Sequence, residues 1–139
     1  GAGAAGGIGG ALGGVLGASM VQGIQKVLDI SGLDSKLESC DIVITGEGRA
    51  DAQTLRGKVP VGVLKYVRAH TVPVHRPKVI LIAGQVSDRQ QILNAGFDAV
   101  LQITPEGMPL SEALDPVTAS ANITQSMQSY LQQRCSGEK

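Results

Sequence analysis

Two carboxylates and three cations lie in one short stretch of this sequence, between Thr45 and Lys58. Glu47 and Asp51 are four positions apart, with Arg49 between them and Lys58 seven positions further on. Paired carboxylates can hold Mg²⁺ or accept a proton from a substrate hydroxyl. Guanidinium and ammonium groups can neutralise a phosphate or a substrate carboxylate. These residue types therefore predict a site, with Glu47 and Asp51 as candidate Mg²⁺ ligands.

Further polar residues in the same stretch also allow a simpler interpretation. Gln53 and Thr54 add an amide and a hydroxyl, and Arg56 adds another cation. The simpler alternative is a solvated loop in which Asp51 only caps a helix. For Arg56 alone we favour a solvated side chain with no part in binding.

A glycine-rich segment at the start of the sequence is a second candidate for anion binding. Gly1, Gly3 and Gly6 match the spacing Gly-x-Gly-x-x-Gly, and Gly7 follows. The segment lacks the preceding strand and the later acidic residue that a dinucleotide fold needs. As a helix N-terminus it can still offer amides to an anion, and close packing is the other explanation. Its glycines would cost a helix roughly 7 kcal/mol, so we expect packing or a ligand to offset that cost.

A buried strand is expected to position the charged stretch. The β-branched run Asp41–Ile44 indicates this strand, and ligands of parallel α/β sheets bind where the chain leaves the carboxyl end of a strand. The unbroken apolar run Val79–Ala83 predicts a central strand, and Phe97–Ile103 predicts a third. The exits of the three strands should share one edge of the sheet; they are Gly46–Lys58, Gly84–Ser87 and Thr104–Pro109.

Helical patterns fill the segments around the strands. One predicted helix runs from Ala4 to about Leu28, with a break near Ser19–Gly23, and another runs from Pro60 to about His70. A short predicted helix ends at Gly96. A final helix is predicted from the apolar residues Ile123, Met127, Tyr130 and Leu131. Ser87–Gln90 matches a capping box for the helix that ends at Gly96. The alternation of helices and strands predicts an α/β fold with a parallel sheet.

Composition narrows the class of protein. Twelve basic residues balance twelve acidic ones and aromatic residues make up only 2%, so we expect no nucleic-acid partner. Glycine and alanine dominate residues 1–19, and we expect no membrane span there. Cys40 and Cys135 are too few for a disulfide framework, which favours a reducing compartment, the cytoplasm. Because the first residue is Gly1, we expect a fragment of a longer protein.

Three segments together resemble the C-terminal part of the bacterial glycerate kinases, a two-domain family that phosphorylates D-glycerate with ATP. They are Gly1–Gly7, the motif ITGEGRADAQTLRGKVPVGV at residues 44–63, and Ile82–Gly84. The resemblance runs from Gly1 to about Ala121. It implies an α/β fold with a three-layer, Rossmann-like parallel sheet that is incomplete in this chain. Residues 1–135 would form the C-terminal segment of that domain, and residues 136–139 a disordered tail.

The resemblance also implies roles for the residues that match its motifs. Asp51 would accept the proton of the substrate hydroxyl, with Glu47 as its neighbour, and either could hold Mg²⁺. Lys58 would be catalytic too, and Arg49 would hold the glycerate carboxylate or the transferring phosphoryl group. The remaining matches are expected to bind substrate or phosphate: Gln53, Thr54, Gly1, Gly3, Gly6, Gly7 and Gly84.

The implied reaction uses ATP as co-substrate and Mg²⁺ as cofactor. Its partners would be D-glycerate, ATP and the missing N-terminal part of the same chain, and the isolated fragment would be inactive. Two alternatives stay open. One is a catalytically incomplete module that binds a small anion or has a structural role. The other is a dinucleotide-binding oxidoreductase, which would bind NAD(P) and not ATP.

Overall fold

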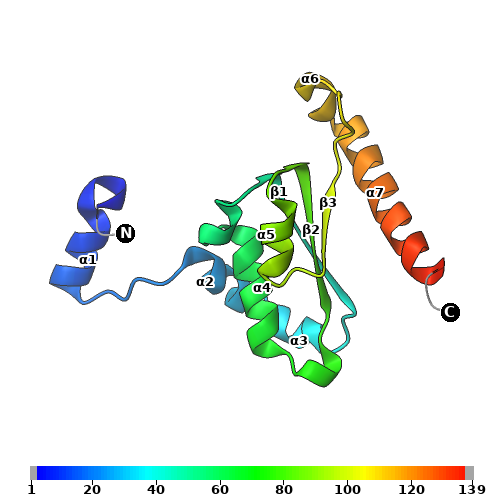
Figure 1. Ribbon diagram of the computed structural model, residues 1–139. Coiled ribbons are helices and arrows are strands. Elements are labelled where there is room, and N and C mark those ends of the chain that lie inside the picture. The colour runs from blue at the N-terminus through cyan, green and yellow to red at the C-terminus, as the bar shows by residue number, and fades with distance from the viewer. Residues whose placement is uncertain (1–2, 137–139) are drawn as a thin grey trace.

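Three parallel strands form the sheet around which the chain folds (Figure 1). β1 (Ile42–Ala50), β2 (Lys78–Val86) and β3 (Ala99–Gln102) lie side by side in chain order. They belong to a computed structural model that describes residues 3–136. β2 is the central strand, as the unbroken apolar run Val79–Ala83 predicts. The α/β fold with a parallel sheet is confirmed.

Helices precede, connect and follow these strands. In chain order the helical segments are η1 (Ala4–Gly7), α1 (Ile8–Leu16), α2 (Gly23–Ile30), α3 (Leu33–Leu37), η2 (Thr54–Arg56), α4 (Val59–His70), η3 (Pro73–His75), α5 (Arg89–Asn94), α6 (Leu110–Ala113) and α7 (Pro116–Ser136). As expected, Pro60 lies in the first turn of α4 and His70 ends it. Ser136 belongs to α7, and the rest of the expected tail lies outside the described residues. No helix within residues 3–136 has the length and apolar character needed to cross a membrane.

Helices on the two faces of the sheet give a three-layer arrangement. Val79, Leu81 and Val100 are buried in the core that α4 and α5 cover. Side chains alternate between the faces along a strand. Leu101 therefore points to the opposite face, where α7 runs past β3 (Figure 1). The core lies mainly on the α4 side, because α7 leaves Ile123 and other apolar side chains exposed.

β1 continues well beyond the predicted strand. The predicted strand ends at Ile44, but β1 pairs with β2 as far as Ala50 and includes Glu47 and Arg49. Backbone N–H and C=O groups make this pairing, so glycines and charged side chains do not prevent it where β2 supplies partners. The charged stretch therefore begins inside the sheet and not in a loop.

The glycine-rich helix α1 stands apart from the body of the molecule (Figure 1). α1 ends at Leu16 and α2 begins at Gly23, which confirms the expected break. Ile24 packs against the core, whereas Ile8 and Leu12 are 58% and 44% exposed. Of the two offsets expected for the glycines, packing or a ligand, close packing is therefore not seen at α1. Among the described residues, its apolar side chains have no partner surface that offsets the cost of the glycines.

The predicted capping box before α5 is wrong. Its N-cap residue, Asp88, has φ of +51°, in the left-handed region, and makes no side-chain capping bond. Instead Asp88 Oδ2 accepts a hydrogen bond from the Ala52 N–H, at 3.3 Å. The Ser87 N–H also donates to the Ala50 carbonyl, at 2.8 Å. These two bonds join the exits of β1 and β2, which confirms that the exits share an edge.

Candidate active site

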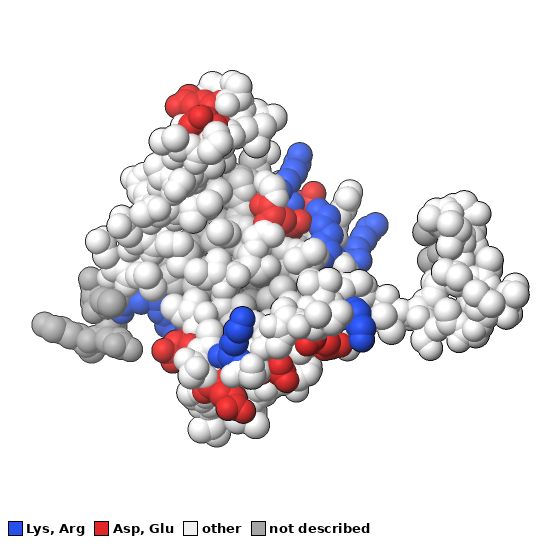
Figure 2. All heavy atoms as spheres, turned by 180° about the vertical axis from the view of Figure 1, so that it is seen from behind, with Lys and Arg blue, Asp and Glu red and all other residues white. Residues whose placement is uncertain are grey.

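A cluster of two carboxylates and two cations lies at the carboxyl end of β1. The Lys58 ammonium is 3.3 Å from Glu47 Oε2 and 3.9 Å from Asp51 Oδ1, so one cation bridges both carboxylates. Arg49 Nε lies 3.9 Å from Asp51 Oδ2. The Glu47 side chain is only 14% exposed, whereas that of Arg49 is 65% exposed. Figure 2 shows basic and acidic side chains gathered on the side of the body from which the N-terminal segment projects.

The turn after β1 fixes the orientation of both carboxylates. The Thr54 hydroxyl donates to Glu47 Oε1 and accepts a hydrogen bond from the Asp51 N–H, at 3.1 Å. The Gln53 N–H donates to Asp51 Oδ1 at 2.9 Å, while the Gln53 side chain is exposed. Thr54 is fully buried. Each carboxylate is thus held by donors on the protein, as a preorganised acid–base site requires.

A glycine directs Lys58 back toward the strand. Gly57 follows η2 with φ of +95°, a left-handed conformation that glycine adopts without strain. Lys58 is then extended, with φ of −66° and ψ of 168°, and immediately precedes α4. Pro60 favours a helical start at this point, because its fixed φ suits the first turn. The sequence Gly57–Pro60 therefore brings the ammonium to Glu47.

An open hollow of about 630 Å³ adjoins the cluster and is called the β1 hollow below. Three parts of the chain form its wall: the start of α2, β1, and the junction of η2 with α4. The lining residues are Gln22, Gly23, Ile24, Gly46, Glu47, Arg56, Gly57, Lys58, Val59 and Pro60. α2 and α4 both begin at the hollow, and helix N-termini carry partial positive charge. With Lys58 and Arg56, these N-termini make the hollow suited to an anion.

The contribution of α2 to this hollow is not among the features predicted from the sequence. α2 and α4 pack so closely that a Cβ on Gly62 would lie 2.6 Å from two side-chain carbons of Ile24. An isolated glycine inside an apolar helical pattern is a signal of such close packing. Gly62 is such a glycine and could have indicated this contact from the sequence. Arg56, which we expect to be solvated, is exposed and also lines the hollow.

Three of the glycines predicted to bind anions do not lie at the cluster. Gly3, Gly6 and Gly7 lie in or beside η1, in the segment that stands apart in Figure 1. Gly1 lies outside the described residues. Gly84 lies in β2, where an added Cβ would be 2.7 Å from the Gly48 carbonyl oxygen, so the close approach of the two strands already requires a glycine. A binding role for these glycines stays a prediction.

The donor set of the cluster limits which metal it can hold. No group of three or more His, Cys, Asp or Glu side chains within residues 3–136 is placed to hold a metal ion. Glu47 and Asp51 offer two carboxylates. Mg²⁺ commonly takes one or two carboxylates from a protein and its other ligands from substrate phosphates and water. The two residues therefore fit Mg²⁺ that binds together with a phosphate-bearing substrate.

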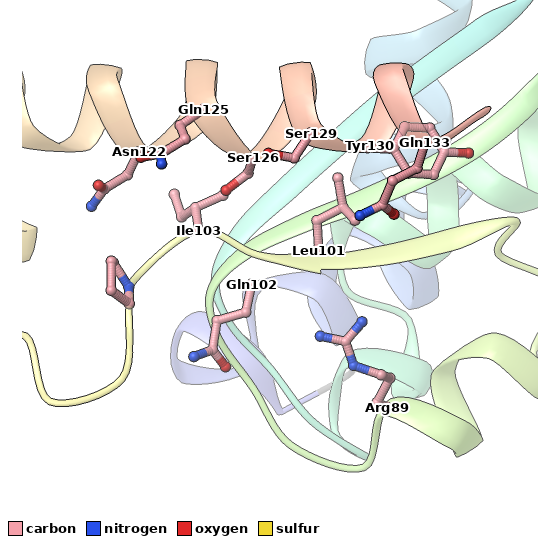
Figure 3. A pocket seen from close by; sticks show the side chains of 11 residues that line it. Arg89, Leu101, Gln102, Ile103, Asn122, Gln125, Ser126, Ser129, Tyr130 and Gln133 are labelled. Carbon is pink, nitrogen blue, oxygen red and sulfur yellow. The ribbon is translucent and has the colours of Figure 1, made fainter. Parts of the chain in front are cut away.

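A second hollow, of about 390 Å³, lies between β3 and α7 (Figure 3). Its polar side chains are amides, hydroxyls and one guanidinium. The Gln102 amide is engaged at both ends, accepting from the Val86 N–H at 3.0 Å and donating to the Thr104 carbonyl at 3.0 Å. Arg89 donates to the Val100 carbonyl. No carboxylate from residues 3–136 lines this hollow, so this part of the chain offers it no base like those of the β1 cluster.

Neither histidine belongs to the cluster. His70 Nδ1 is 2.8 Å from the Tyr66 carbonyl oxygen, and its ring stacks on that of Tyr66. His75 Nε2 is 2.7 Å from the Glu38 carbonyl oxygen. Both rings are tied to backbone groups outside the cluster at the carboxyl end of β1. The acid–base candidates of the site are therefore its carboxylates.

The sequence matches the glycerate kinase family over residues 1–133. It is 43% identical over 116 residues to a glycerate kinase of Bacillus subtilis (strain 168), an overlap of 83% of this chain and 29% of the relative. It is 42% identical over 114 residues to glycerate 2-kinase of Escherichia coli (strain K12), again 29% of that relative and 81% of this chain. The chain thus spans less than a third of the length of these curated relatives.

A solved structure is similar as well. The crystal structure of a glycerate kinase 2 from Salmonella typhimurium LT2 matches with a TM-score of 0.63 and 33% sequence identity. The match covers 100% of this chain and 33% of the other. The fold described above is therefore similar to about one third of that larger protein.

Proposed function

The chain belongs to the glycerate kinase family, and we propose that it supplies part of the active site of an enzyme that transfers the γ-phosphoryl group of ATP to a hydroxyl of D-glycerate. The products are ADP and phosphoglycerate. Because the chain spans 29% of these relatives, we propose that a longer form of the same polypeptide supplies the remaining contacts. We assign the reaction to the cytoplasm, the compartment that supplies ATP.

One observation carries this proposal: a single ammonium lies between two carboxylates at the edge of a hollow suited to an anion. Lys58 Nζ is 3.3 Å from Glu47 and 3.9 Å from Asp51. Phosphoryl transfer needs a positioned acceptor for the hydroxyl proton and cations near the transferred oxygens. Asp51 and Lys58 supply these two elements side by side.

In the proposed step, Asp51 accepts the proton of the glycerate hydroxyl while that oxygen forms a bond to the γ-phosphorus. The bond from this phosphorus to the β,γ-bridging oxygen breaks, and ADP leaves with the electron pair. The Gln53 N–H holds Asp51 Oδ1 in place, at 2.9 Å. Lys58 and Arg49, each 3.9 Å from an Asp51 oxygen, offset negative charge on the transferring group.

The other residues of the cluster have supporting roles in this proposal. Glu47 positions Lys58 and, with Asp51, would hold Mg²⁺. When bound, Mg²⁺ neutralises charge on the ATP phosphates. Thr54 orients Glu47 through its hydroxyl, and the exposed Gln53 amide is available to the substrate. Arg49, which is largely exposed, is proposed to bind the glycerate carboxylate.

Asp51→Asn in the full-length enzyme is the direct test, because it keeps the size of the side chain and removes its capacity to accept a proton. We expect kcat for glycerate-dependent ADP formation to fall by about a hundredfold or more, with an unchanged melting temperature. Glu112→Gln, an exposed carboxylate on α6, is the matched control and should keep full activity. Unchanged turnover in Asp51→Asn and Lys58→Met would exclude the assigned roles. Binding of glycerate and ATP by the wild type without turnover would support an anion-binding module instead.

A further inference from the structure

Within the described part of the chain, Arg56 is a cation of the β1 hollow that no carboxylate engages. Its exposed side chain lines the hollow together with Glu47 and Lys58. The ion pairs at the cluster are made by Lys58 and Arg49, and none involves Arg56. Its backbone is nevertheless fixed, because its N–H donates to the Gln53 carbonyl at 3.0 Å within η2. The backbone of Arg56 is thus held in place, while its guanidinium makes no ion pair with a described residue.

The charges of the cluster show why an additional cation matters. Glu47 and Asp51 carry two negative charges, and Lys58 and Arg49 carry two positive charges at 3.3 to 3.9 Å from them. The net charge of these four groups together is zero, so a ligand with several negative charges needs a further cation. The positive potential that remains at the hollow comes from Arg56 and from the N-termini of α2 and α4.

We propose that Arg56 binds an anionic oxygen group of the substrate, a phosphate or a carboxylate, in the β1 hollow. The inference rests on the proposed function and adds a substrate-binding residue to it. The planar guanidinium offers parallel N–H donors that match two oxygens of either group. Gly57, with φ of +95°, turns the chain directly after Arg56, so that Arg56 and Lys58 both reach the same hollow.

Arg56 differs from an ordinary surface arginine in its position at the β1 hollow. Arg76 is exposed too, but it follows η3 in the connector that leads into β2. It lines a different groove, with Asp41, Val74 and Lys78 among its neighbours. An exposed arginine there has no reason to influence a ligand beside Glu47. Arg76 is therefore the matched control for Arg56.

The test compares Arg56→Gln, Arg56→Lys and Arg76→Gln in the full-length enzyme. KM is measured for ATP at saturating D-glycerate and for D-glycerate at saturating ATP, together with kcat and the melting temperature. We expect Arg56→Gln to raise one KM about tenfold or more, with kcat and the melting temperature little changed. Arg56→Lys should restore part of the loss, because it keeps the charge without the paired donors. A rise confined to ATP assigns a phosphate, and a rise confined to glycerate assigns the carboxylate.

Both KM values unchanged in Arg56→Gln would overturn the inference while leaving the proposed function intact. If the wild-type enzyme does not phosphorylate glycerate, the proposed function fails, and a titration with inorganic pyrophosphate decides the role of Arg56. Binding that is weaker in Arg56→Gln than in both the wild type and Arg76→Gln would support the inference. Binding that is equal in all three, or absent in all three, would overturn it.

Discussion

The Thr54 hydroxyl donates a hydrogen bond to the Glu47 carboxylate and so ties the turn after β1 back to the strand. The same hydroxyl accepts a bond from the Asp51 N–H at 3.1 Å, so it connects both carboxylate residues of the cluster. Thr54 is fully buried, which keeps water from replacing either bond. One hydroxyl therefore holds the Glu47 carboxylate and the backbone of Asp51 together.

Replacing Thr54 by valine should weaken both stability and catalysis. Valine keeps the shape of threonine but leaves Glu47 Oε1 and the Asp51 N–H without this partner. We expect the free energy of unfolding to fall by about 1–3 kcal/mol and kcat to fall with it. Urea denaturation and ADP formation measure the two effects. Thr54→Ser keeps the hydroxyl and should retain most of the activity; equal losses of kcat in both variants would point to methyl packing instead.

Gly62→Ala should disturb the packing of α2 on α4. The added Cβ would lie 2.6 Å from two carbons of Ile24, a contact that forces the helices apart. We expect a loss of about 1–3 kcal/mol in the free energy of unfolding. Ile24→Ala in the same chain makes room for the methyl group, so the double variant should lose less than the sum of the single losses. Gly14→Ala, where a Cβ meets nothing within 4 Å, is the control; equal effects at Gly14 and Gly62 would refute the packing argument.

The sequence predicts the strands best where burial alone decides them. Val79 and Leu81 are completely buried, so the apolar run of β2 carries an unambiguous signal. The second half of β1 carries no such signal, because Gly46, Glu47 and Arg49 are poor strand residues. Their pairing is set by the backbone of β2, which lies more than thirty residues away in the chain. Local pattern cannot reveal that kind of support.

The candidate site also combines features that a local sequence pattern predicts with features that depend on distant contacts. The residues of one contiguous motif, among them Glu47, Asp51 and Lys58, are predicted as a group and do lie together. The wall contributed by α2 depends on a packing contact between Ile24 and a glycine of α4, distant in sequence. Asp88 similarly has left-handed backbone and binds Ala52, although its sequence neighbours match a capping box. Tertiary contacts decide these features, and the single sequence does not encode them locally.

Asp115 should show a pH-dependent effect on the start of α7. Its Oδ1 accepts a hydrogen bond from the Thr118 N–H at 2.9 Å, and this bond, with a further one from the Thr118 hydroxyl, lowers the Asp115 pKa. Since the folded-state pKa lies below the unfolded one, the charged carboxylate stabilises the helix start above the unfolded pKa, and this contribution disappears as pH falls through the lowered pKa. A carboxyl-carbon NMR titration should give a midpoint below the ordinary 3.8. Thr118→Val should move that midpoint upward; a wild-type midpoint at or above 3.8 would be inconsistent with the cap.

Gly84→Ala should separate a packing role of this glycine from a ligand-binding one. The added Cβ would lie 2.7 Å from the Gly48 carbonyl oxygen, and a backbone atom inside a paired sheet cannot move aside easily. We therefore expect the free energy of unfolding to fall by about 1–3 kcal/mol. Gly48→Ala, whose Cβ meets open space, is the control on the facing strand and should change stability by no more than about 0.5 kcal/mol. If Gly84→Ala raises the KM for ATP or glycerate while its unfolding curve matches the wild type, the packing explanation fails and the predicted binding role gains support.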